Sequence, residues 1–101
     1  MFRRSRFGRI VETQLDVFVR ENRELIDEAR ERLAAYNRAD RSEAEELYGD
    51  YVDTIEAGTE ALADMRDHYA ATVADADAYV LEFNRAVARR LPAFAGELEN
   101  R

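Results

Sequence analysis

The chain has 101 residues, of which 47% are apolar and 37% are charged, and its formal net charge is −7. This length suits one domain with a continuous core, and the composition favours an ordered protein over a disordered one. Cysteine is absent, which excludes disulfides, Cys-based zinc sites and thiol nucleophiles. Because no apolar run approaches the roughly 20 residues that span a bilayer, and the N-terminus lacks a secretory signal, we expect a cytoplasmic protein.

Charge is distributed unevenly along the chain. Residues 1–9 contain four arginines and no acidic residue, whereas residues 42–77 contain eleven acidic residues and only Arg66 as a basic one. An acidic block of this size repels polyanions. Only the short basic arm is therefore a candidate for contact with nucleic acid.

The first predicted helix covers residues 10–36. Apolar residues recur there at alternating spacings of three and four, which is typical of an amphipathic helix that buries one face. Charged pairs one turn apart, such as Asp16 with Arg20, support the opposite face. The buried stripe consists of Val11, Leu15, Phe18, Asn22, Leu25, Ala29 and Tyr36.

A tight turn is predicted at residues 37–41. Asn37 can adopt the left-handed conformation that ends helices, and Ser42 with Glu45 matches the capping box that starts the next one. The second helix is predicted from Ser42 to about Val73, with one apolar stripe and a solvated acidic face. Such a short connection makes the two helices antiparallel neighbours.

The third predicted helix begins near Asp75 and Asp77, which can cap it. Its stripe consists of Ala76, Val80, Phe83, Val87, Leu91, Phe94 and Leu98. Pro92 should kink or restart this helix.

The chain has two possible paths between the second and third helices. The spacing of three and four continues unbroken from Met65 to Val80, so one rod from Ser42 to Leu91 is the alternative to a turn. We favour a turn at residues 74–77, because a single chain buries its stripes better as a bundle. The predicted fold is thus an all-α antiparallel three-helix bundle over residues 10–99, a long hairpin plus a shorter third helix, preceded by a basic arm at residues 1–9.

Gly58 indicates a close approach between the first two helices, because glycine in mid-helix costs about 1 kcal/mol relative to alanine. With the turn centred near residues 39 and 40, Gly58 lies opposite Asn22, whose amide can bond to Thr59 or to backbone. A buried asparagine can fix register or oligomeric state. We therefore hypothesise a polar layer in the core at Asn22, Gly58 and Thr59.

The third helix is too short to cover the far end of the hairpin. The pairing of residues across the predicted turns leaves four apolar residues partly exposed near the first turn: Leu33, Tyr36, Leu47 and Tyr48. An exposed apolar patch of this kind commonly marks a protein interface. We expect a homodimer that completes a four-helix-like core. In the alternative, the tail after Pro92 folds over this end within the monomer.

Residues suited to catalysis are scarce. His68 is the single histidine and Asp64 lies one turn before it, which makes this a candidate metal pair, although a boundary histidine bonded to Asp64 is the favoured interpretation. The serines form no triad with His68, and the glycines form no phosphate-binding loop. The sequence predicts no catalytic residue, no cofactor and no enzymatic activity.

The N-terminal arm is the second candidate site. The arginines of this arm are interleaved with phenylalanines, and such a pattern can bind the phosphates of nucleic acid or an anionic membrane. These arginines are Arg3, Arg4, Arg6 and Arg9. We favour a tail, or an arm lying along the acidic helix, because four arginines are few for an autonomous site. The sequence thus favours a non-catalytic bundle that acts through protein contacts, with a basic-arm adaptor and a carboxylate–histidine metal protein as alternatives.

Overall fold

The computed structural model describes residues 6–101. This part of the chain forms five α-helices and no strand, which confirms the all-α prediction. The helices are α1 (Gly8–Glu21), α2 (Arg23–Arg38), α3 (Ala44–Ala70), α4 (Ala76–Arg90) and α5 (Pro92–Glu99). Among them, none is both long enough and apolar enough to cross a membrane.

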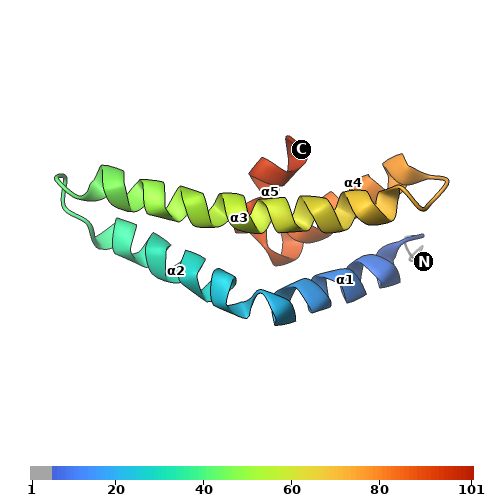
Figure 1. Ribbon diagram of the computed structural model, residues 1–101, viewed down its shortest axis with the longest axis horizontal. Coiled ribbons are helices and arrows are strands. Elements are labelled where there is room, and N and C mark those ends of the chain that lie inside the picture. Colours follow the sequence, from blue (N-terminus) through green and yellow to red (C-terminus); the bar gives the residue numbers. More distant parts are fainter. Residues whose placement is uncertain (1–5) are drawn as a thin grey trace, which may run out of the picture.

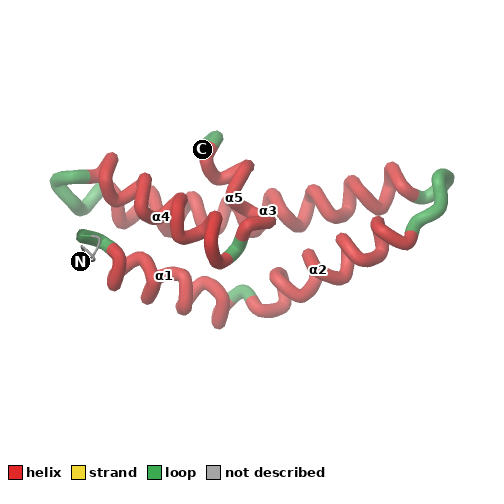
Figure 2. The backbone as a smooth tube through the Cα atoms, turned by 180° about the vertical axis from the view of Figure 1, so that it is seen from behind, coloured by secondary structure: helices red, strands yellow, loops and turns green. Residues whose placement is uncertain are grey.

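The longest helix, α3, is the scaffold of an elongated molecule of 50 × 29 × 22 Å. α1 and α2 follow one another along one side of α3, and α4 runs back along α3 after the chain reverses direction at residues 71–75 (Figure 1). Figure 2, seen from behind, places α4 beside α1, while α2 packs mainly on α3. The chain therefore does not continue as one rod from Ser42 to Leu91, which was the alternative to a turn.

The first predicted helix is divided at Asn22, which has non-helical φ and ψ angles of −119° and 30°. The backbone N–H of Asn22 and its side-chain amide both donate to the carbonyl of Phe18, at 2.9 and 3.0 Å. Side-chain bonding back to the preceding turn bends a helix. α1 and α2 therefore form a shallow V instead of one straight helix (Figure 1).

The connection between α2 and α3 differs from the predicted capping pattern. α2 continues to Arg38 and ends because Ala39 is extended, so Asn37 is helical and the left-handed prediction is wrong. The Asp40 carboxylate accepts hydrogen bonds from the hydroxyl and N–H of Ser42, at 2.7 and 3.0 Å, and these bonds lower the pKa of Asp40. Asp40 thus organises the turn, and Ser42 does not cap α3, which begins at Ala44.

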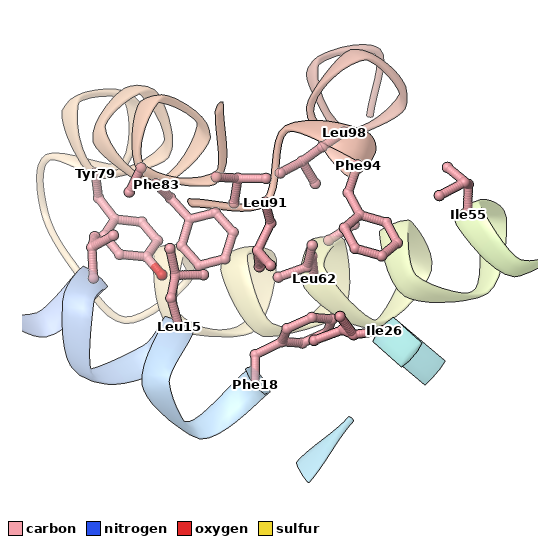
Figure 3. Close-up of a cluster of buried hydrophobic side chains, with 14 of the residues drawn as sticks. Leu15, Phe18, Ile26, Ile55, Leu62, Tyr79, Phe83, Leu91, Phe94 and Leu98 are labelled. Carbon is pink, nitrogen blue, oxygen red and sulfur yellow. The ribbon is translucent and has the colours of Figure 1, made fainter. Parts of the chain in front are cut away.

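The hydrophobic core lies where α1, α3, α4 and α5 meet. Its largest fully buried side chains include most of the predicted stripe of α1 and part of that of α4 (Figure 3). In contrast, no residue between positions 30 and 53 is buried. The main members of the core are Val11, Leu15, Phe18, Leu62, Tyr79, Phe83, Val87, Phe94 and Leu98.

Gly58 is buried and receives the ring of Phe94 from α5. A Cβ atom at Gly58 would lie 2.9 Å from a methyl carbon of Leu25 and closer still to the Phe94 ring. Phe94 is itself 2% exposed and packs edge-on against Phe18, with ring centroids 6.3 Å apart. The group that approaches Gly58 most closely is thus a phenylalanine ring of α5, whereas the predicted close approach was between the first two helices with Asn22 opposite Gly58.

We expect Gly58→Ala to lower the free energy of unfolding by about 1–2 kcal/mol, because overpacking at the Phe94 ring outweighs the gain in helix propensity. Gly49→Ala is the matched control, since nothing lies within 4 Å of a Cβ there. That control should raise stability by about 0.5–1 kcal/mol. Urea unfolding measures both changes, and an equal stabilisation by the two variants would contradict the packing described for Gly58.

Candidate functional site

The predicted interface residues lie at the end of the α2–α3 hairpin. Leu33 is 39% exposed and Tyr48 is 51% exposed, whereas Tyr36 and Leu47 are half-buried. The rings of Tyr36 and Tyr48 are 5.2 Å apart, and Tyr48 in turn lies 6.4 Å from Tyr51. The structure therefore joins α2 and α3 here through a tyrosine cluster with much of its apolar surface in water. We call Leu33, Tyr36, Leu47 and Tyr48 the hairpin-end patch.

An apolar groove continues from this patch toward the core. It forms a cavity of about 230 Å³ between α2, α3 and the start of α5. The tail after Pro92 does not extend over the hairpin end, because Phe94 is seated at Gly58 and the Leu98 carbonyl is bonded to Arg66. The lining residues include Ile26, Ala29, Arg30, Leu33, Tyr51 and Pro92.

The two helices that carry the patch differ in charge. From Glu43 to Glu60, α3 and its cap hold seven acidic residues and no basic one, whereas α2 holds four arginines and four acidic residues. Arg32 of α2 already lies 3.8 Å from Asp50 of α3 and pairs with Glu28. Arg30 is 75% exposed and has a single, long ion pair within its own helix.

The hypothesised polar layer does not form as a network between helices. The Asn22 amide donates to the Phe18 carbonyl, and the Thr59 hydroxyl donates to the Ile55 carbonyl at 2.8 Å. Each side chain thus bonds to a backbone carbonyl of the preceding turn. For Asn22, a bond to backbone was one of the two possibilities given by the sequence. The role of Gly58 is to admit Phe94, as described above.

Arg66 is a buried cation that the sequence analysis missed. Its side chain is 2% exposed, and its guanidinium donates to Asp67 at 2.8 Å, to Asn84 at 3.1 Å and to the Leu98 carbonyl at 3.1 Å. These bonds connect α3 with α4 and α5. The spacing of Arg66 could have predicted its burial, since it lies four residues after Leu62 on the buried stripe of α3.

Replacing Arg66 by alanine should lower the free energy of unfolding by about 2–3 kcal/mol, because Asn84 and the Leu98 carbonyl lose a buried donor. Arg85→Ala removes an exposed arginine of α4 that forms no ion pair with residues 6–101, and should change stability by less than about 0.5 kcal/mol. Thermal unfolding monitored by circular dichroism compares the two. Equal stability of both variants would rule out the bridging role of Arg66.

The candidate metal pair lies on the surface of α3. Asp64 and His68 are both exposed. Among residues 6–101, no group of three or more histidine or carboxylate side chains is arranged to hold a metal ion.

The described part of the N-terminal arm is packed on the bundle. Phe7 is 7% exposed and meets Tyr79 edge-on, and its N–H donates to the Glu82 carboxylate at 2.9 Å. Arg6 pairs with Asp75 at 2.9 Å, and Arg9 lies in the first turn of α1, while Arg3 and Arg4 fall outside the described residues. The apolar ring of Phe7, which belongs to the arm expected at residues 1–9, thus packs with the core.

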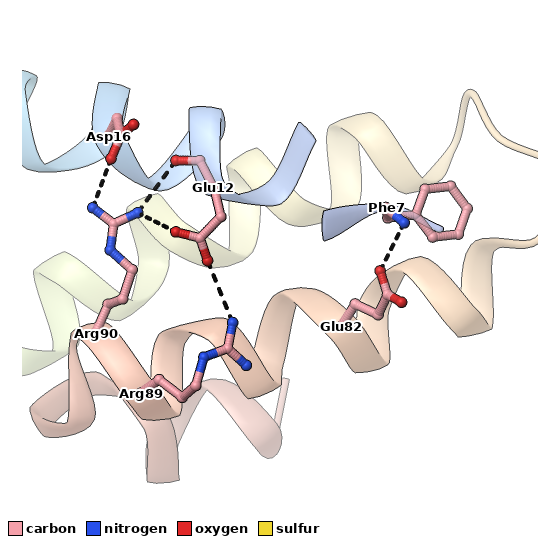
Figure 4. A network of polar contacts seen from close by, with 6 residues as sticks. All are labelled: Phe7, Glu12, Asp16, Glu82, Arg89 and Arg90. Atoms are coloured by element: carbon pink, nitrogen blue, oxygen red, sulfur yellow. Dashed lines mark hydrogen bonds and ion pairs between the residues drawn. The ribbon is translucent and has the colours of Figure 1, made fainter. Parts of the chain in front are cut away.

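Ion pairs connect α1 with the C-terminal turn of α4 (Figure 4). Glu12 accepts from Arg90 at 3.0 Å and from Arg89 at 3.3 Å, and Asp16 accepts from Arg90 at 2.7 Å. Asp16 therefore pairs across helices with Arg90, in place of the expected partner Arg20 within its own helix.

Tyr79 places a phenol inside the core, where its hydroxyl donates to the side-chain oxygen of Gln14 at 2.7 Å. Burial raises its pKa from the ordinary 10.0 to about 12. The neutral phenol is therefore the form that the fold accommodates.

Alkaline pH should destabilise the folded protein through Tyr79. Because the pKa is higher in the folded chain, the stabilising contribution is complete below pH 10.0 and is lost between there and about pH 12. Stability should fall in this window by up to about 1.4 kcal/mol per pH unit. Tyrosinate absorbance should show one of the five tyrosines ionising late, and Tyr79→Phe, unlike Tyr48→Phe, should remove that step. Simultaneous titration of all tyrosines in the folded protein would contradict this.

No protein-family model matches this chain, and neither a curated protein nor a solved structure is significantly similar to it.

Proposed function

We propose that this protein acts through protein contacts and not by catalysis, and that it forms a homodimer through the ends of its α2–α3 hairpins. The observation that supports this proposal is the uncovered hairpin-end patch. α4 and α5 pack on the half of α3 that lies away from the turn, so the hairpin end is only two helices thick (Figure 1). Two helices have no enclosed core, whereas two such ends together form a four-helix bundle.

Charge favours a second copy as the occupant of this surface. A two-fold arrangement places α2 of each copy beside α3 of the other, and both contacts form together because the interface is self-complementary. The exposed Arg30 of α2 would then face the purely acidic half of α3 from the partner copy. The pairing of Arg32 with Asp50 inside one copy is an example of the same α2–α3 complementarity.

The size of the surface sets the expected affinity. The two-helix section is about 12 residues long on each helix, which corresponds to roughly 18 Å. A face of this size is about half of the 800 Å² per partner of a standard interface, so we expect a weak association. Dimerisation should therefore depend on protein concentration.

Sedimentation velocity of the full chain should show a monomer–dimer equilibrium, and Tyr48→Asp should shift it to monomer by placing a charge in the interface. Leu81→Asp is the matched control, because Leu81 is 50% exposed on α4, away from the hairpin end. The control should dimerise like the unaltered chain. Purely monomeric behaviour of the unaltered chain at about 100 μM would reject the proposal, as would equal effects of the two substitutions.

A further inference from the structure

A second cavity lies at the opposite end of the molecule, between α1 and α4. Its volume is about 540 Å³, within the range of small-ligand sites. Three arginines line it, Arg9 from α1 and Arg85 and Arg89 from α4, together with two glutamates. Val11 and Ala86, each 1% exposed, lie beneath the same cavity.

The two glutamates are already occupied by donors of the protein. Glu12 accepts from Arg89 and Arg90, and Glu82 accepts from the N–H of Phe7 (Figure 4). In contrast, neither Arg9 nor Arg85 forms an ion pair with any residue from 6 to 101, and residues 1–5 contain no acidic side chain. The cavity is therefore lined by two exposed arginines from different helices, Arg9 and Arg85, whose charge has no internal carboxylate partner, in a chain of net charge −7.

We infer that this cavity is a binding site for a phosphate monoester. A phosphate has three terminal oxygens and accepts from several guanidinium groups at once, whereas a carboxylate has only two oxygens to offer. The volume exceeds that of a phosphate group, so the cavity has room for the esterified part of the ligand. This site is independent of the proposed dimer, because it uses none of the residues of the hairpin-end patch.

The test titrates the isotopically labelled full chain with glycerol 3-phosphate and follows backbone amide signals by NMR. Shifts should be confined to α1 near Arg9 and to α4 between Glu82 and Arg89. Arg9→Gln and Arg85→Gln should each weaken binding by about tenfold without changing the melting temperature, because neither side chain forms an ion pair in the fold. Arg41→Gln, in the turn between α2 and α3, removes the same charge far from the cavity and should leave binding unchanged.

A substitution that is expected to tighten binding, instead of weakening it, strengthens the test. Glu82→Gln removes a negative charge from the cavity wall and keeps an oxygen that can accept from the Phe7 N–H. It should therefore tighten the binding of glycerol 3-phosphate, whereas a general loss of fold would weaken it.

Vesicles of phosphatidylcholine with and without phosphatidic acid distinguish the source of the phosphate. Binding of glycerol 3-phosphate alone assigns the site to a soluble ester, and binding to phosphatidic acid vesicles that is lost in Arg85→Gln assigns it to a lipid headgroup. Both results support the site. The inference is overturned if neither probe binds at about 10 mM total phosphate ester, or if Arg41→Gln weakens binding as much as Arg85→Gln.

Discussion

Burial of the apolar stripe of α3 is the constraint on which the rest of the structure depends. At its centre, Leu62 is enclosed by side chains from α1, α4 and α5, among them Phe18 and Phe94 (Figure 3). The stripe is longer than the segments that cover it, because α3 has 27 residues whereas α4 has 15 and α5 turns back after Pro92. Between positions 30 and 53 no residue is buried, and the hairpin-end patch is the direct result of this difference in length.

Polar contacts decide how firmly the covering segments are held. Arg66 ties the end of α5 to α3 and α4 from inside the core, and Arg90 ties α4 to α1 at the surface. The buried group matters more, since exposed ion pairs contribute at most about 1 kcal/mol each, whereas a buried donor leaves unsatisfied acceptors when removed. Burial is thus uneven along the molecule: the fully buried side chains gather around Leu62, and no residue between positions 30 and 53 is buried.

Helical periodicity was enough to predict the all-α class and much of the core, because residues such as Val11, Leu15 and Phe83 recur with the helical period and are buried. The kink at Asn22 escaped prediction, because it arises from competition for one carbonyl oxygen, which spacing does not reveal. Arg66 was counted only as the single basic residue of the acidic block, since composition says nothing about which side of a helix a lone cation faces. Phe7 was grouped with its arginine neighbours, and the cavity of Arg9 and Arg85 joins residues from distant parts of the chain. The structure was needed for both.

The central claim, that the uncovered end of α3 is completed by a second copy, is tested most directly by the shape of the particle in solution. Two molecules with a longest dimension of 50 Å that overlap only at their hairpin ends form a dimer about 80 Å long. Small-angle X-ray scattering over a concentration series should show this length appear together with a doubled mass. A particle that stays near 50 Å at every concentration, or a dimer no longer than one molecule, would contradict it.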